Sequence, residues 1–176
     1  MKRYLIAVLS FILVVFAAAG TVFKEDAETE YLRIHIRADS NDEKDQAVKY
    51  LIKDAVVDFL TPFIAECDDK KKAESVLKKN LSSIELIADG ILAENGFTYK
   101  SAAKLKSEEF PTRTYGELTL EKGYYDALII ELGSGKGDNW WCVVYPPLCF
   151  TKTGAGYVYK SKIYEIIRKF FDNKEK

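Results

Sequence analysis

The sequence has 176 residues, of which 48% are hydrophobic and 30% are charged, and its formal net charge is -1 at pH 7. These proportions are typical of a folded globular domain and exclude an intrinsically disordered chain, which would be depleted in apolar residues. Basic and acidic residues are interleaved along most of the chain, so the sequence offers no clustered basic face and predicts no nucleic-acid partner.

Residues 1–23 show the pattern of an export signal. Lys2 and Arg3 come first, an uncharged apolar run follows, and Ala17 and Ala19 provide the small residues of a signal-peptidase cleavage site. The positive end stays in the cytoplasm while the apolar run enters the bilayer. The sequence therefore predicts that the rest of the chain is exported.

An uncleaved membrane anchor is the competing interpretation of this hydrophobic leader helix. Residues 4–23 amount to about 20 residues, which as a helix can cross about 30 Å of hydrocarbon. In either case residues 24–30 form a charged tether and residues 31–176 form a single domain outside the cytoplasm. Contact with the membrane is then made through the leader.

The domain begins with a predicted strand at residues 31–37. Leu32, Ile34 and Ile36 alternate with polar residues, which is the period of a half-buried strand. The other side of this strand is basic and carries Arg33, His35 and Arg37. That stripe would meet either an acidic partner or solvent.

A helix is predicted from about residue 42 to about residue 59. Ser40 and Glu43 have the spacing of a capping box, and Pro62 is expected to stop the helix at about Thr61. The residues expected to face the core lie three and four apart: Val48, Leu51, Ile52, Ala55 and Phe59.

A second helix and a run of strands are predicted next. The helix carries apolar residues at helical spacing from Ala73 to Leu92 and ends at Asn95-Gly96. Strands are predicted at residues 97–106, 115–120, 125–132 and 141–145, with turns at residues 122–123 and 133–137. A last amphipathic helix, residues 162–171, presents Ile163, Ile166, Ile167 and Phe170.

This order of elements predicts an α+β fold. Strands that follow one another through short turns pair antiparallel, so we expect a mostly antiparallel sheet. Two consecutive helices and the C-terminal helix should pack on that sheet, and the hydrophobic leader helix should precede the domain. No second domain and no internal repeat is expected.

Residues 133–137 read Gly-Ser-Gly-Lys-Gly and invite comparison with a phosphate-binding loop. Such a loop requires Ser or Thr directly after its lysine to bind magnesium, and Gly137 follows Lys136 here. A flexible hairpin loop is the favoured interpretation. No nucleotide and no other cofactor is expected.

His35 is the single histidine of the chain. A metal site built on two histidines is therefore excluded, and no cysteine or carboxylate spacing supports any other metal site. An exported cysteine hydrolase, with His35 as the base for Cys142 or Cys149, is an alternative that sequence distance leaves open. A structural role for these residues is the more common outcome.

Cys142 and Cys149 are also the pair that a disulfide would join after export. An extended chain would hold them about 23 Å apart, whereas a bridge requires Cα atoms about 5.5 to 6 Å apart. Pro146-Pro147 is a place for the bend that a bridge needs. A buried thiol role would produce the same residues, so both alternatives stay open, and Cys67 would remain a free thiol.

The segment of residues 139–150 contains both tryptophans. In a strand, Trp140 and Trp141 point to opposite faces, so a sheet with one buried face easily buries only one of them. An exposed tryptophan beside prolines would anchor a protein partner, whereas the alternative is that both are packed in the core.

Several stretches resemble, in the same order, the motifs of the stage II sporulation protein R family. Residues 32–40 with Asp45-Gln46 resemble the family's R-x-H…A-N-S…D-Q opening, and the remaining resemblances lie at residues 110–116, 123–128 and 139–150. The sequence departs from the family pattern at Asp39, where the pattern has Asn before Ser40. That change keeps a short polar side chain near the helix start and leaves its role open.

The resemblance implies a signalling protein, not an enzyme, made in the forespore of an endospore-forming bacterium. It would be secreted across the forespore membrane into the intermembrane space, either free or anchored by its N-terminus. There it would activate a membrane-embedded aspartic protease, which matures a pro-sigma factor in the mother cell. A passive wall or coat component is a further alternative.

The residues expected to contact that protease were chosen for charge or aromatic area combined with expected accessibility. They are Arg33, His35, Arg37, Trp140, Trp141 and Tyr145.

Overall fold

The computed structural model describes residues 30–152 and 157–174. The predicted leader, residues 1–23, and the tether up to residue 29 lie outside the described residues. The elements, in chain order, are β1 (Leu32–Arg37), α2 (Glu43–Ile64), α3 (Lys70–Glu94), β2 (Ser101–Phe110), β3 (Arg113–Tyr115), β4 (Leu118–Leu120), β5 (Gly123–Leu132), β6 (Asn139–Tyr145), the 3-10 helix η1 (Leu148–Lys152) and α4 (Tyr157–Asp172).

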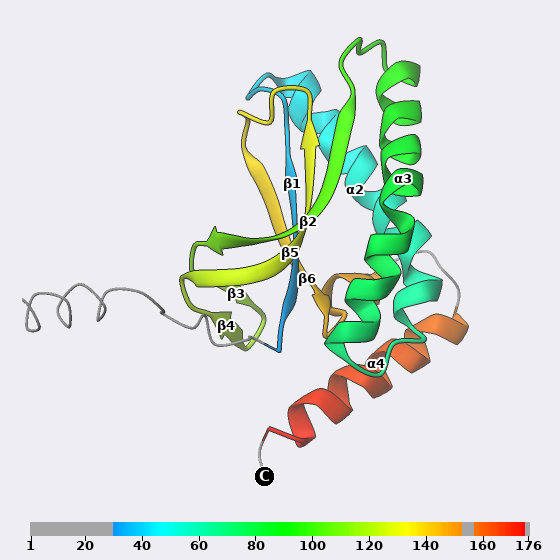
Figure 1. Cartoon of the computed structure of the whole chain (residues 1–176), viewed down its shortest axis with the longest axis vertical. Coiled ribbons are helices and arrows are strands. Elements are labelled where there is room, and N and C mark those ends of the chain that lie inside the picture. The colour runs from blue at the N-terminus through cyan, green and yellow to red at the C-terminus, as the bar shows by residue number, and fades with distance from the viewer. Residues whose placement is uncertain (1–29, 153–156, 175–176) are drawn as a thin grey trace, which may run out of the picture.

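The predicted α+β class is confirmed. Four strands form the main sheet in the order β2-β5-β1-β6, with antiparallel pairs at both edges and a parallel β1–β5 pair in the centre. The helices α2 and α3 cover one face of this sheet, and the small β3–β4 hairpin lies on the other side (Figure 1). The first strand, β1, therefore lies between β5 and β6, which both come from the second half of the chain.

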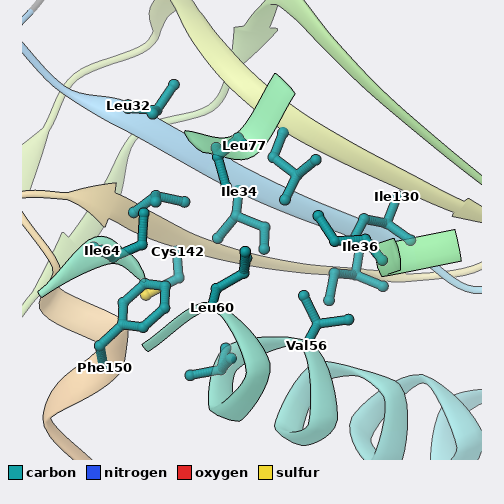
Figure 2. Packing of buried hydrophobic residues seen from close by; sticks show 14 of the residues in the cluster. Leu32, Ile34, Ile36, Val56, Leu60, Ile64, Leu77, Ile130, Cys142 and Phe150 are labelled. Carbon is teal, nitrogen blue, oxygen red and sulfur yellow. The ribbon is translucent and has the colours of Figure 1, made fainter. Parts of the chain in front are cut away.

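The face covered by α2 and α3, called here the helix face, holds the larger core. Leu32, Ile34 and Ile36 from β1 meet Leu60 and Leu77 from the two helices, and all five side chains have no exposed surface. Figure 2 shows these strand residues packed against the α2 side chains. Burying a side chain of this kind contributes about 1.5 to 3 kcal/mol, which makes this layer the main source of stability.

The buried stripe of α2 differs from the prediction. It repeats every four residues through Val48, Ile52, Val56, Leu60 and Ile64. Leu51 is instead 49% exposed, and Ala55 and Phe59 are only half-buried. The prediction is confirmed at Val48 and Ile52 and was wrong at the other positions, because the buried side of α2 also carries Lys49 and Val57.

The predicted start of α2 at about residue 42 is confirmed, but its predicted capping box and its predicted end were wrong. The Ser40–Glu43 capping box does not form, because the hydroxyl of Ser40 accepts the N–H of Asp42 and donates to Asp45. At the other end, the helix continues through Pro62 to Ile64. Proline removes one donor, but the carbonyl that loses it belongs to Asp58, an exposed residue, where water can substitute.

The strands predicted at residues 125–132 and 141–145 are confirmed as β5 and β6. The strand predicted at residues 97–106 is shifted and runs from Ser101 to Phe110. The strand predicted at residues 115–120 is a hairpin, because Gly116 adopts a φ of 64° that suits glycine and reverses the chain.

Residues 133–137 do not form the predicted hairpin loop, since β5 and β6 both pair with β1 rather than with each other. The segment crosses the end of β1, and the backbone N–H of Gly137 donates to the carbonyl of Ala38 over 2.9 Å. A Cβ on Gly137 would lie 2.2 Å from the carbonyl oxygen of Ser40, so only glycine fits. Asp39, the departure from the family pattern, accepts the N–H of Ser134.

The predicted second and C-terminal helices are confirmed as α3 and α4. Ile163 of α4 is fully buried, and Ile166, Ile167 and Phe170 pack partly buried against the core. Across residues 30–152 and 157–174, no helix has both the length and the apolar character that a membrane crossing requires.

Candidate functional site

The strand alternation predicted for β1 places its basic residues on the side of the sheet away from α2 and α3. Arg33 lies beside Val143, and His35 lies between Ile129 and Trp141 of the neighbouring strands. We call this side the hairpin face. Its residues come from all four main strands and from the β3–β4 hairpin: Arg33, His35, Arg37, Lys104, Glu108, Phe110, Tyr115, Tyr125, Ile129, Glu131, Asn139, Trp141 and Val143.

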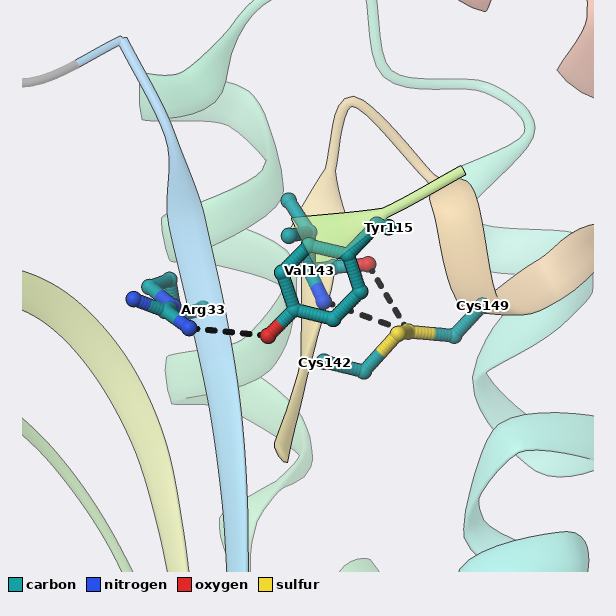
Figure 3. The surroundings of a disulfide bond; sticks show 5 residues. All are labelled: Arg33, Tyr115, Cys142, Val143 and Cys149. Carbon is teal, nitrogen blue, oxygen red and sulfur yellow. Dashed lines mark hydrogen bonds between the residues drawn. A yellow bond between two sulfur atoms is a disulfide. The ribbon is translucent and has the colours of Figure 1, made fainter. Parts of the chain in front are cut away.

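Arg33 is a fully buried cation inside an aromatic cage. Its Cζ lies 4.2 Å from the ring centroid of Phe110 and 4.8 Å from that of Tyr125. Its Nη2 donates to the hydroxyl of Tyr115 over 2.8 Å, the contact drawn in Figure 3. Burial lowers the pKa of Arg33, although the hydroxyl of Tyr115 opposes that shift. No carboxylate pairs with this guanidinium within the described chain.

His35 lies beside the cage and stacks on Trp141, with ring centroids 3.7 Å apart. Phe110 meets the histidine edge-on, and only 1% of His35 is exposed. Burial, followed by the positive charge of Arg37, lowers the pKa of His35 to about 4. The imidazole is therefore neutral at pH 7, and its Nε2 accepts a hydrogen bond from Nε of Arg37 over 3.4 Å.

A network of charged residues surrounds Arg37 at the half-exposed part of the face. Arg37 pairs with Glu108 and, over 2.6 Å, with Glu131, which also accepts from Lys104 over 2.5 Å. The hydrogen bond from Lys104 lowers the pKa of Glu131. Burial opposes ionisation of Glu108, but the hydrogen bond and charge of Arg37 outweigh it and keep the pKa of Glu108 below its usual value. Both carboxylates are thus charged at pH 7.

Buried polar atoms without a partner gather on the hairpin face. Among the described residues, the buried side-chain nitrogens and oxygens that lack a hydrogen bond are Arg33 Nε, Arg33 Nη1, His35 Nδ1, Glu108 Oε2 and Asn139 Oδ1. Leaving such a group unsatisfied costs about 1 to 3 kcal/mol, so native structures contain few. All five atoms belong to the hairpin face, and two of them, His35 Nδ1 and Glu108 Oε2, lie 3.8 Å from each other.

The six residues chosen as partner contacts divide between two locations. Arg33, His35, Arg37 and Trp141 come together on the hairpin face. Trp140 lies on the helix face, as strand alternation predicts, and is half-buried there. The accessibility expected for Arg33 and His35 was wrong, because the rings of Phe110 and Trp141 cover them.

Tyr145 was also expected to be accessible and is buried instead. Its hydroxyl donates to the carbonyl of Asp68 over 2.7 Å, and its ring meets that of Phe170. Burial raises the pKa of its phenol. Tyr145 thus ties the last strand to the α2–α3 connection and to α4, which is a structural contact.

Cys142 and Cys149 are joined in a disulfide, with Cα atoms 6.2 Å apart (Figure 3). Cys142 lies opposite Ile34 in the sheet and so belongs to the helix face, whereas His35 points to the hairpin face. The backbone N–H of Val143 donates to the sulfur of Cys149. The geometry therefore does not bring His35 together with a free thiol of either cysteine.

The remaining cysteine, Cys67, is a buried free thiol. Burial raises its pKa to about 11, so it is protonated at pH 7 and a poor nucleophile. No group of three or more His, Cys, Asp or Glu side chains within residues 30–152 and 157–174 is placed to hold a metal ion.

Sequence reasoning missed the cage residues and the acidic part of the network. Phe110, Tyr115 and Tyr125 fall within the stretches that resemble the family motifs, so that resemblance was the available signal. Glu108 lies beyond the end of the strand predicted at residues 97–106, and only the longer β2 places it on the face of Lys104 and Lys106.

Each of the stretches that resemble family motifs thus contributes side chains to the hairpin face, while the alternate residues of the same strands face the helices. The family model for Stage II sporulation protein R matches residues 28–155 of the chain. The chain belongs to the stage II sporulation protein R family. It is 30% identical over 171 residues to the Stage II sporulation protein R of Bacillus subtilis (strain 168), covering 92% of this chain and 76% of that protein. No solved structure matches it.

The family match spans every strand of the main sheet and the β3–β4 hairpin. It therefore includes the whole hairpin face and the disulfide. The sporulation assignment of the family applies to this chain. The hairpin face is the candidate functional site of this stage II sporulation protein R.

Proposed function

We propose that this domain is an exported sporulation signal that binds and activates a membrane-embedded aspartic protease. The protease would then remove the pro-sequence of a sigma factor in the mother cell. The single observation that carries the proposal is that polar and aromatic residues from all the family-motif stretches, far apart in the sequence, meet on the hairpin face. Chemistry on a substrate is not part of the proposed role.

The hairpin face has the composition of a contact surface. Trp141 is half-buried and carries the guanidinium of Arg113 over its ring, with Cζ 5.7 Å from the centroid. Trp and Arg are enriched among the residues that dominate binding energy in protein interfaces. The adjacent charged network of Arg37, Glu131 and Lys104 supplies a polar rim.

Activation requires that the domain bind one state of the protease more tightly than the other. A shift from 1% to 99% active protease needs about 5.5 kcal/mol of differential binding. The four-stranded sheet can supply such a difference because it holds its own side chains in place before binding.

The proposed location is the intermembrane space around the forespore. Export through residues 1–23 would deliver the domain there, and retention of the leader would hold it at the forespore membrane. The partner is accordingly met on its extracytoplasmic side.

The proposal is tested by deleting the gene and measuring the unprocessed sigma factor in sporulating cells. We expect the precursor to accumulate, and a copy of the wild-type gene should restore processing. A copy encoding Trp141→Ala should restore it poorly, whereas Trp140→Ala, on the other face, should act as the matched control. Normal maturation in the deletion strain would instead favour a passive wall or coat component.

A further inference from the structure

The guanidinium of Arg33 is unusual because it is buried without a counterion. None of its surface is exposed, and its side-chain nitrogens make a single hydrogen bond, from Nη2 to the phenol of Tyr115. Nε and Nη1 have no partner. Buried charges in proteins are normally paired, since an unpaired one is costly.

The unsatisfied donors have the geometry that a carboxylate needs. In a guanidinium, the N–H of Nε and one N–H of Nη2 point in the same direction and form a two-pronged edge. The single oxygen of Tyr115 satisfies only one prong, and Nε is left over. A carboxylate has two oxygens that accept both hydrogen bonds in parallel.

The surroundings of Arg33 favour an anion further. Phe110 and Tyr125 place ring faces against the guanidinium and hold its plane in one orientation. Burial lowers the pKa of Arg33, Tyr115 and Tyr125 oppose that shift, and the positive charge of Arg113 adds a smaller repulsion. A bound carboxylate would relieve both the missing hydrogen bond and this repulsion.

The phenol of Tyr115, which contacts Arg33 in this structure, belongs to the small β3–β4 hairpin. Tyr115 lies at the end of β3, and β3 and β4 are three residues long and pair only with each other. Thr114 and Thr119, which face each other across the hairpin, are exposed. A two-stranded hairpin of this size is marginally stable by itself. It is held to the main sheet by the packing of the buried Leu120 and of the partly buried Tyr115 and Leu118.

We propose that the Arg33 cage is a carboxylate-binding site that the β3–β4 hairpin occupies with Tyr115 in the free protein. When the hairpin swings away, a carboxylate of a protein partner takes the Nε and Nη2 positions and the phenol of Tyr115 is released. This inference rests on the proposed function in one respect, namely that the hairpin face meets a partner. The carboxylate is either an acidic side chain or a chain terminus.

The site is tested on the full-length chain in detergent micelles by following the ¹⁵N NMR signal of the Arg33 Nε–H. Three N-acetylated peptides serve as probes. Two have an amidated C-terminus, acetyl-Gly-Glu-Glu-Gly-amide and acetyl-Gly-Gln-Gln-Gly-amide, and the third, acetyl-Gly-Gly-Gly, has a free C-terminus. A saturable shift with the glutamate peptide, at least tenfold weaker with the glutamine peptide, supports a side-chain carboxylate. A comparable shift with the free terminus assigns the site to a chain end.

Tyr115→Phe provides a variant that keeps the ring and therefore the packing of the cage. Removing the internal hydrogen bond should raise the affinity for the carboxylate peptide about tenfold, because the competitor for Nη2 is gone. Tyr124→Phe, whose side chain is 53% exposed, is the matched control and should leave the affinity unchanged.

Equal responses to the glutamate and glutamine peptides without a stronger response to the free terminus, or no response to any of the three peptides, would overturn the inference. An unchanged affinity in Tyr115→Phe would overturn the role of the hairpin as the occupant. Sigma factor processing is scored separately in cells. Peptide binding with normal processing in the deletion strain would reject the proposed function alone, whereas defective processing without peptide binding would reject only the site.

Discussion

The two faces of one sheet differ sharply although the same strands build both. On the helix face, Ile34 and Ile36 meet apolar side chains from α2 and α3. On the hairpin face, Arg33 and His35 alternate with them, equally buried but with polar atoms left unpaired. Burial alone therefore does not distinguish a core residue from a residue of the candidate site. The two differ in whether their buried polar atoms have hydrogen-bond partners.

This difference suggests a division of labour. The apolar contacts of the helix face stabilise the fold. The hairpin face holds charged and aromatic groups in fixed positions, and burying those groups costs part of that stability. Strained or unsatisfied groups tend to cluster at functional sites for this reason.

The largest effect is expected on the helix face. Leu77→Ala removes a fully buried side chain of α3 and should lower the free energy of unfolding by about 2 to 5 kcal/mol. Leu86→Ala in the same helix, where the side chain is 73% exposed, should cost less than about 0.5 kcal/mol. Denaturant unfolding of both variants measures the difference, and equal costs would contradict the assignment of the core.

A pH effect is expected on the hairpin face. The pKa of His35 is about 4 in the folded protein, well below its ordinary value of 6.5. As the pH falls from 6.5 to 4, the unfolded chain binds a proton that the folded chain rejects. The free energy of unfolding should therefore decrease by up to roughly 3 kcal/mol across this window.

His35→Gln is the control for this pH effect, since Glu108 and Glu131 titrate in both proteins. The difference in unfolding free energy between wild type and variant should change steadily between pH 6.5 and pH 4. Parallel curves over that range would show that His35 is not held neutral.

Reduction of the disulfide should have a somewhat smaller effect. Cys142 and Cys149 close a short loop with a sequence separation of 7, for which the chain-entropy relation gives about 2.5 kcal/mol. Unfolding of the wild-type chain with and without a reductant measures this contribution. The Cys142→Ala/Cys149→Ala double variant should not respond to the reductant, and a response there would assign the effect to something else.

The smallest effect concerns the edge of the charged network. Lys104→Ala removes one ion pair with Glu131 at a half-exposed position, which should cost less than about 1 kcal/mol. High salt should shrink the difference between wild type and variant further, because exposed charges are screened. A larger, salt-independent loss would mean that this side of the hairpin face contributes to stability like the helix face.

Local features of the fold could be predicted from the sequence because they depend on nearby residues. The alternation of Leu32, Ile34 and Ile36 fixed the two faces of β1, and Asn95-Gly96 marked the end of α3. The opposite orientations of Trp140 and Trp141 followed from the same alternation.

Features that depend on distant pairing could not be predicted. The parallel pairing of β1 with β5 joins residues far apart in the sequence and places Glu131 beside Arg37. The burial of Arg33 depends on Phe110, Tyr115 and Tyr125, which are all far from it in the sequence. Nothing in the local pattern of residues 31–37 distinguishes a basic stripe facing solvent from one inside an aromatic cage.

The central claim is that the hairpin face, and not the surface of the helices, meets the partner. The most direct test replaces the gene in sporulating cells with two matched double variants, Arg113→Ala/Trp141→Ala on the hairpin face and Leu51→Ala/Leu86→Ala on the exposed side of the helices. The amount of unprocessed sigma factor is measured in each strain, after circular dichroism of both purified proteins has shown native folding. We predict accumulation with the first pair only, and accumulation with the second pair alone would contradict the account.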